Sequence, residues 1–284
     1  MKHTLRTELH KALTNKMLYI AIAFGLIFCA MDVMENIGKI REFDQRIANQ
    51  ILGLRLSTDH QGYSLFYLWM GIQPNTRGAN LFHVIWPVMA GMAYGWSYAS
   101  ERRSGVYNQI AARSGARTYY VSKYIAVFAS GGLAVAVPFL LNLLANAMVL
   151  PYAHISPYFN QMSNVQFLSQ LYYTNHWVYA LVRCVIVFLC GGVAASLCFL
   201  VGTKLRYGVM VMLTPYAVYV AWDAVIIALN SSVLQANNYC LSPLRMLPGA
   251  GMLLPGWLML CILGGLTLIS FGVGYWQVVK HELA

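Results

Sequence analysis

The chain has 284 residues, of which 59% are apolar and only 10% are charged, and its formal net charge at pH 7 is +10. An average globular domain carries about 25% charged residues, so a soluble fold of this size could not cover its surface with so few charges. Disorder is excluded as well, because disordered chains are poor in aromatic and apolar residues. The composition therefore predicts a polytopic membrane protein.

Six apolar stretches are long enough to cross about 30 Å of hydrocarbon as helices. They lie at about residues 17–34, 81–99, 124–150, 177–202, 208–229 and 252–276. Pro138 predicts a kink or tilt in the third stretch, and Pro215 and Pro255 are tolerable in the fifth and sixth where neighbouring helices surround them. The sequence thus predicts an all-α protein in which residues 1–284 form a single transmembrane domain, with both termini on one side of the membrane.

The distribution of basic residues predicts which side that is. If the termini are cytoplasmic, the inner segments carry Lys2, Arg6, Lys11, Lys16, Arg102, Arg103, Arg113, Arg117, Lys123, Lys204, Arg206 and Lys280, and the outer segments only Lys39, Arg41, Arg46, Arg55, Arg77 and Arg245. Cytoplasmic segments of membrane proteins carry the excess of Lys and Arg. Both ends are therefore expected in the cytoplasm, and the net basic charge indicates topology rather than a nucleic-acid partner.

Two connecting segments show helical periodicity. In residues 1–16, Leu5, Leu9 and Leu13 share one face, a pattern typical of a short amphipathic helix lying on the inner leaflet. The longest outer loop, at about residues 35–80, repeats apolar residues every three to four positions and predicts an amphipathic outer helix. The residues of that repeat are Ile40, Phe43, Ile47, Ile51 and Leu54.

The inner loop at 100–123 contains a short amphipathic segment between two glycines, Gly105 and Gly115. Glycine adopts backbone conformations that let the chain turn sharply at either end of such a segment. Basic residues in the loop would hold it against the inner membrane surface. An ordinary loop that binds anionic lipids explains these features equally well.

The loop resembles the signature of the ABC-2 type permeases, the transmembrane subunits of ATP-driven exporters. The matching positions are Glu101, Gly105, Ser114, Gly115, Arg117 and Lys123. The segment Gln109–Ile125 is especially similar to permeases of Gram-positive bacteria associated with bacteriocin and lantibiotic export or self-protection. The chain departs from the commoner pattern at Ser114, where many members of the family have proline.

The resemblance implies a division of labour between this chain and a partner. The loop around Val106–Ala112, including Tyr107 and Ile110, would be a coupling helix that docks on a separate ATPase subunit. That subunit would bind ATP and Mg, because this chain has no G-x-x-x-x-G-K-[ST] motif and is expected to hold no cofactor or metal. The permease would act in the plasma membrane of a bacterium as a homodimer or with a second permease subunit. It would export an amphipathic peptide or a lipid-like compound, in contact with membrane lipids.

Two other functions stay open as alternatives. The first is an immunity or scaffold protein that works without an ATPase, which copurification of an ATPase would distinguish from the permease. The second, an intramembrane enzyme, lacks the usual catalytic sets, since no Glu lies in a predicted span and Ser114 lies in the inner loop. The histidines outside or near the outer span ends lack the i, i+4 spacing of metal ligands; they are His60, His83, His154 and His176.

Charged residues within the predicted spans favour one ion pair. Arg183 and Asp223 lie at similar depth, each six residues from the outer end of its span, which is about 9 Å at 1.5 Å per residue. A lone charge in hydrocarbon costs at least about 2.5 kcal/mol, so we expect these two to form a structural salt bridge rather than to face a substrate. Asp32, near the outer end of the first span, is expected to reach the interface.

Overall fold

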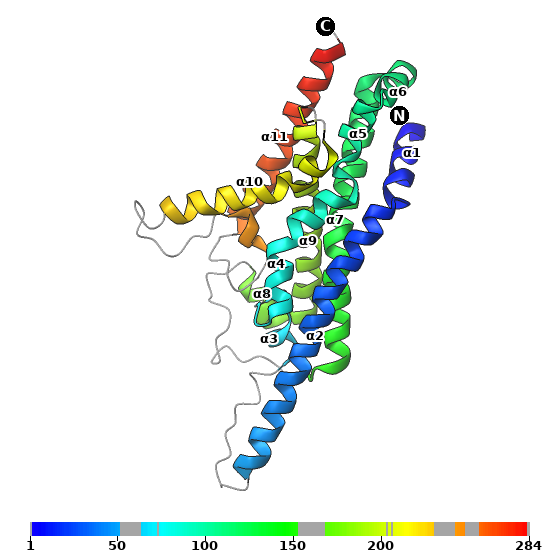
Figure 1. Cartoon of the computed structure of the whole chain (residues 1–284). Helices are drawn as coiled ribbons and strands as arrows, with labels where there is room; N and C mark the ends of the chain where they lie inside the picture. The colour runs from blue at the N-terminus through cyan, green and yellow to red at the C-terminus, as the bar shows by residue number, and fades with distance from the viewer. Residues whose placement is uncertain are drawn as a thin grey trace.

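The computed structural model describes residues 2–51, 64–72, 74–152, 168–202, 204–205, 207–229, 242–247 and 256–282. Within these residues the fold is all-helical, as predicted (Figure 1). The α-helices are α1 (Lys2–Leu13), α2 (Lys16–Ile51), α3 (Leu65–Leu68), α4 (Arg77–Ala90), α5 (Ser97–Arg103), α6 (Val106–Ser114), α7 (Ala116–Val149), α8 (Ser169–Thr174), α9 (His176–Gly202), α10 (Gly208–Leu229) and α11 (Gly256–Glu282). A π-helical turn, η2 (Gly91–Gly95), and a 3₁₀ turn, η4 (Pro243–Met246), complete the described elements.

Five of the described helices are long and apolar enough to cross a membrane. The qualifying segments are Lys16–Gln45, Ala116–Val149, His176–Gly202, Gly208–Leu229 and Leu258–Val278. They correspond to five of the six predicted spans, although the first four residues of the sixth, including Pro255, lie outside the described residues. The structure thereby indicates a multi-pass membrane protein.

The remaining predicted span, 81–99, is interrupted. It is divided into α4, the π-turn η2 and α5, and π-turns are mostly single insertions in α-helices. Both glycines of η2 face close neighbours, because a Cβ added at Gly91 would lie 2.4 Å from the Met212 carbonyl oxygen and one at Gly95 would lie 2.7 Å from Cys198 Cβ. The interruption therefore lies where the backbone of this segment passes close to α9 and α10.

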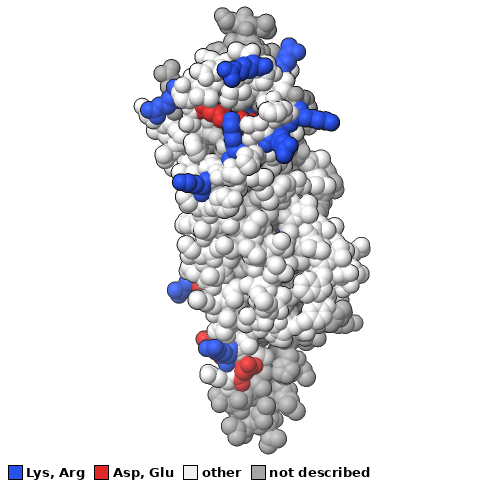
Figure 2. Space-filling model, turned by 90° about the vertical axis from the view of Figure 1, so that its right-hand side faces the viewer, with Lys and Arg blue, Asp and Glu red and all other residues white. Residues whose placement is uncertain are grey.

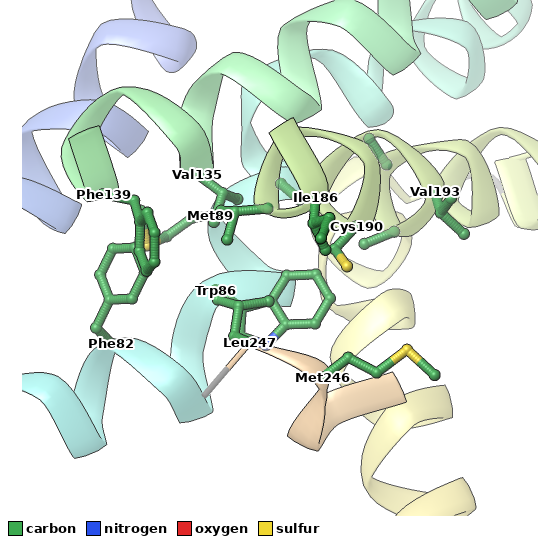
Figure 3. Close-up of a cluster of buried hydrophobic side chains, with 14 of the residues drawn as sticks. Phe82, Trp86, Met89, Val135, Phe139, Ile186, Cys190, Val193, Met246 and Leu247 are labelled. Atoms are coloured by element: carbon green, nitrogen blue, oxygen red, sulfur yellow. The ribbon is translucent and has the colours of Figure 1, made fainter. Parts of the chain in front are cut away.

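Helices α7 and α9 form the centre of the bundle. A Cβ added at Gly131 would lie 2.2 Å from Ala195 Cβ, and one at Gly191 would lie 2.7 Å from the Gly131 carbonyl oxygen. Small residues of this kind let membrane helices approach closely. Figure 3 shows how side chains of α4, α7, α9 and the η4 turn interlock beside this contact, among them Phe82, Trp86, Met89, Val135, Phe139, Ile186, Cys190, Val193, Met246 and Leu247.

Helix α2 continues well beyond the predicted first span. The separate outer helix expected from residue 40 onward is instead the last part of α2, which ends at Ile51; Leu54, the last residue of that repeat, lies outside the described residues. The segment after the span contains no proline. Its one glycine is Gly38, and no atom lies within 4 Å of a Cβ added there. Nothing in the local sequence therefore ends the helix.

Helix α1 differs from the predicted surface helix in direction and in buried face. Figure 1 shows α1 running in nearly the same direction as α2, beside the end of α7, rather than across the bundle. Its buried residues are Glu8 and Ala12, whereas Leu13 is 41% exposed. Leu9 packs against the core beside them, so the leucine periodicity identified the packed face only in part, and a buried carboxylate lies at the centre of that face.

Helix α10 packs through a narrow stripe and crosses the long axis of the bundle (Figure 1). Only Val211, Pro215 and Tyr219, at i, i+4 and i+8, are buried. A helix that is apolar all round gives no sequence signal for its orientation, so the composition identified the helix without its direction.

Charge is distributed unevenly along the molecule. On the face drawn in Figure 2, lysines and arginines gather at the end that carries α1, α5 and α6, an uncharged belt crosses the middle, and a few charges of both signs lie at the opposite end. The described N- and C-terminal helices both reach the basic end (Figure 1).

Candidate functional site

The short helix α6 projects from the basic end of the molecule between two sharp turns. Gly105 precedes it with φ of 75° and Gly115 follows it with φ of 76°. Residues other than glycine adopt positive φ at a cost of about 1–2 kcal/mol. The prediction that these two glycines turn the chain at either end of an amphipathic segment is confirmed.

Helix α6 has one packed face and one free face. Tyr107, Ile110 and Ala111, at i, i+3 and i+4, lie against the core of the bundle. The Tyr107 ring makes edge contacts with Tyr98 and Tyr119 at 5.8 and 5.5 Å. No residue of α6 is fully buried. The other side is exposed and carries Val106, Asn108, Gln109, Ala112 and Arg113.

A buried ammonium group lies where α6 and α7 join the bundle. Lys123 of α7 is 0% exposed, and its Nζ lies 2.9 Å from Glu8 Oε2 and 2.7 Å from Glu101 Oε1. It also donates to the Tyr94 hydroxyl at 2.9 Å and lies 4.3 Å from the centre of that ring. Lys123 thereby joins α1, η2, α5 and α7 in one polar cluster, which we call the Lys123 node and define as Glu8, Tyr94, Glu101, Tyr119 and Lys123.

The remaining members of the Lys123 node satisfy the two carboxylates. The Tyr119 hydroxyl donates to Glu101, and the Tyr94 hydroxyl donates to Glu8 Oε2 at 3.2 Å. Glu8 also accepts from Lys11 at 2.8 Å, on the exposed side of α1. Burial by itself raises the pKa of Glu8, but the charges and hydrogen bonds of Lys123 and Lys11 outweigh it, so the pKa lies below its usual value. Glu8 is therefore ionised at neutral pH, and its charge is balanced.

The structure brings some of the predicted loop residues together and separates others. Glu101 and Lys123 meet in the Lys123 node. Ser114 donates its hydroxyl to the Ile110 carbonyl at 2.8 Å within α6, and Arg117 is exposed in the first turn of α7. Val106 is 38% exposed beside Gly105. The loop is thus a short helix that projects from the bundle, and the Glu101–Lys123 ion pair holds its two ends together.

Three members of the Lys123 node were not anticipated from the sequence: Glu8, Tyr94 and Tyr119. Glu8 is the only acidic residue among the basic residues of the first sixteen positions. That isolation is a weak signal of a buried partner, because a lone acid on a solvated basic helix is equally common. Tyr94 and Tyr119 give no signal in a chain with 19 tyrosines.

The predicted salt bridge between Arg183 and Asp223 is wrong. Asp223 instead pairs with Arg245, with Oδ1 to Nε at 2.9 Å and Oδ2 to Nη2 at 3.0 Å. Arg183 is fully buried and donates to the main-chain carbonyls of Leu247 and of Met246. The prediction assumed two parallel helices, and α10 crosses the bundle instead, so equal depth along each helix does not bring the two side chains together.

Candidate metal and nucleophile positions do not cluster in the described part of the chain. No group of three or more His, Cys, Asp or Glu side chains that could hold a metal ion occurs there. The described cysteines are free thiols at positions 29, 184, 190, 198 and 261. His83 and His176 are buried, while His60 and His154 lie outside the described residues.

Comparisons with known proteins add no assignment. No family model matches the chain, and no curated protein is similar enough to match it.

Proposed function

We propose that this chain is the membrane permease subunit of an ATP-driven ABC exporter, with α6 as the helix that docks on a separate ATPase. The observation that carries the proposal is the geometry of α6. It is a nine-residue helix with no fully buried residue, set off by two positive-φ glycines at the basic end of the molecule. A helix presented in this way offers its free face to another protein in the cytoplasm.

The Lys123 node gives such a docking helix a mechanical connection to the membrane part. Glu101 lies in α5, which leads into α6, and Lys123 lies in α7, which follows α6. Their ion pair at 2.7 Å closes the base of the α5–α6–α7 excursion. Nucleotide-driven closure of two ATPases would move α6, and the ion pairs of Lys123 with Glu101 and Glu8 would pass this movement on to α7 and α1. Nucleotide would bias two states of the permease in this way.

The proposal includes six membrane crossings with both termini in the cytoplasm. The interrupted α4–η2–α5 segment would be the second crossing, and the basic end in Figure 2 would face the cytoplasm. A functional unit would contain two such chains or one chain and a second permease. The transported substrate would be an amphipathic peptide or a lipid-like compound, since the resemblance in the loop is to exporters of such compounds.

Site-directed labelling tests the topology. A cysteine at Ala112, on the exposed face of α6, should react with an impermeant thiol reagent only from the cytoplasmic side. A cysteine at Met148, which is 82% exposed near the end of α7, should react only from the outside. The reverse pattern would refute both the orientation and the docking role of α6.

Docking itself is tested by two matched substitutions at the same end of the molecule. Val106→Asp introduces a charge on the free face of α6, where Val106 is 38% exposed, and Leu13→Asp does so on α1, where Leu13 is 41% exposed. Each variant is expressed in its native host and purified, and any ATPase subunit that copurifies with it is identified. Val106→Asp should lose the ATPase and the substrate-stimulated hydrolysis, and Leu13→Asp should retain the bound ATPase. Equal retention by both variants, or no copurifying ATPase with the unmodified chain, would exclude α6 as the docking helix.

A further inference from the structure

A second polar cluster lies among α2, α4 and α7, near the end of the bundle opposite α6. Its centre is Asp32 of α2, which is 0% exposed. The Asp32 carboxylate accepts from the Thr76 hydroxyl at 2.5 Å and from the side-chain amides of Asn142 and Asn146 at 2.8 and 3.2 Å. Asn36, one turn further along α2, donates to Asn146 Oδ1 at 3.1 Å. The expectation that Asp32 reaches the interface is therefore wrong, and we call these five residues the Asp32 cluster.

The groups bonded to Asp32 are all neutral. No described residue forms a salt bridge with Asp32. Its hydrogen-bond partners are a hydroxyl and two amides, and the Lys39 ammonium acts on it only at a distance. Lys39, two turns along α2, donates its ammonium to the Asn75 carbonyl at 2.7 Å instead. An ionised side chain inside a membrane segment is costly and marks a functional site with a partner by default. A buried carboxylate held by three neutral donors thus calls for a positive partner.

The cluster also contains an acceptor that nothing satisfies. Asn36 is 0% exposed, and its Oδ1 has no hydrogen-bond partner even though its Nδ2 donates to Asn146 and to the Leu68 carbonyl. A buried polar atom without a hydrogen-bond partner has lost its hydration and has gained no bond in exchange, which destabilises the folded state. Covalent geometry keeps Oδ1 next to the Nδ2 that contacts Asn146. The unsatisfied oxygen therefore lies at the Asp32 cluster rather than elsewhere in the bundle.

We propose that the Asp32 cluster binds a monovalent alkali cation. Its candidate ligands are all hard oxygens: the Asp32 carboxylate, the Thr76 hydroxyl and the amide oxygens of Asn36, Asn142 and Asn146. Hard oxygen ligands bind hard cations, and one carboxylate balances one positive charge. The ion would neutralise Asp32 and complete the coordination of Asn36 Oδ1 in a single step.

A proton satisfies the same site less well. The three groups bonded to the carboxylate all donate to its oxygens. A proton on Asp32 would place a fourth donor among them. A cation instead needs the lone pairs that the oxygens still hold. The ion would link the outer part of α2, the start of α4 and the last turns of α7, independently of α6 and its proposed partner.

Thermal unfolding of the purified full-length chain tests the site. The protein in detergent is titrated with NaCl or KCl against choline chloride at constant ionic strength and neutral pH, and the unfolding midpoint is followed by tryptophan fluorescence. A ligand that binds only the folded state raises stability in a saturable way. We expect a saturable rise of the midpoint with sodium or potassium and none with choline.

Three variants locate the effect. Asp32→Asn should abolish the response to alkali cations, and Asn36→Ala should shift the half-saturating concentration upward by about tenfold, the scale of losing one supporting group at an ion site. Asp223→Asn, which removes an acid paired with Arg245 at the protein surface, should leave the response unchanged. If Asp32→Asn does not fold, the shift in Asn36→Ala still decides the matter.

Several results would overturn the proposal. These are a midpoint that does not respond to either cation, a response that persists unchanged in Asp32→Asn and Asn36→Ala, and a midpoint that rises with acidification while remaining insensitive to sodium and potassium. The last result would assign the site to a proton.

Discussion

The Lys123 node allows a sharp test of how burial controls the strength of an ion pair. Glu8 binds two lysines at almost the same distance, Lys123 at 2.9 Å and Lys11 at 2.8 Å. The two lysines differ in exposure, since Lys123 is 0% exposed and Lys11 is 43% exposed. Replacement of each lysine by methionine removes the charge and keeps most of the side-chain volume. The pair of variants therefore isolates the effect of burial at one shared carboxylate.

The expected losses differ several-fold. Lys123→Met leaves Glu101 without its cation and Glu8 with only the exposed Lys11, and removing one partner of a buried pair costs about 3–5 kcal/mol. Lys11→Met removes an exposed pair, which contributes about 0–1 kcal/mol. For domains of about 150–250 residues each kcal/mol shifts the unfolding midpoint by about 2–4 °C, and we use this scale for the chain of 284 residues. Lys123→Met should therefore lower the midpoint by about 6 °C or more, and Lys11→Met by no more than about 4 °C.

The measurement is thermal unfolding of the two variants in the same detergent, followed by circular dichroism. A third variant, Lys123→Met with Glu8→Gln, should regain part of the loss because one stranded carboxylate has become neutral. Equal losses for Lys11→Met and Lys123→Met would refute the argument from burial. A double variant less stable than Lys123→Met would show that Glu8 is not stabilised through Lys123.

Further expectations follow from the same structure. Gly115→Ala should destabilise the protein by about 1–3 kcal/mol through backbone strain alone, because φ is 76° and no atom lies within 4 Å of the added Cβ. Gly264→Ala lies inside α11 and is equally uncrowded, so it should stabilise the protein by up to about 1 kcal/mol. Chemical or thermal unfolding measures both changes. The folded-state pKa of Glu8 lies below its usual value of 4.5, so the stability that ionised Glu8 contributes is present above pH 4.5 and should be lost as the pH falls towards the lowered pKa. Glu8→Gln should therefore make the unfolding midpoint less sensitive to acid. A double-mutant cycle between Asp223 and Arg245 should give a small favourable coupling of about 0.2–1 kcal/mol, measured as the non-additive part of the unfolding free energies; strictly additive losses would contradict the observed pair.

The sequence predicted features that depend on residues close together in the chain. Gly105 and Gly115 identified the limits of α6 because only glycine adopts a positive φ at little cost. The apolar stretches identified the long helices because burial in hydrocarbon demands composition and length, both of which are local. The interruption at Gly91–Gly95 was not predicted; Met212 and Cys198 approach it from other helices, and such contacts leave no local signal in the sequence.

Partners across the bundle were decided only by the tertiary structure. Glu8 and Lys123 are 115 positions apart, and their contact depends on the direction of α1 relative to α2 and α7. Asp223 was assigned to Arg183 on the assumption of parallel helices, whereas the crossing of α10 brings it to Arg245. Asp32 was expected at the interface, but the rotation of α2 turns it towards Asn142. Local sequence therefore determined which helices form and where they turn, while helix direction and rotation, set by packing against neighbours, decided which buried charges meet.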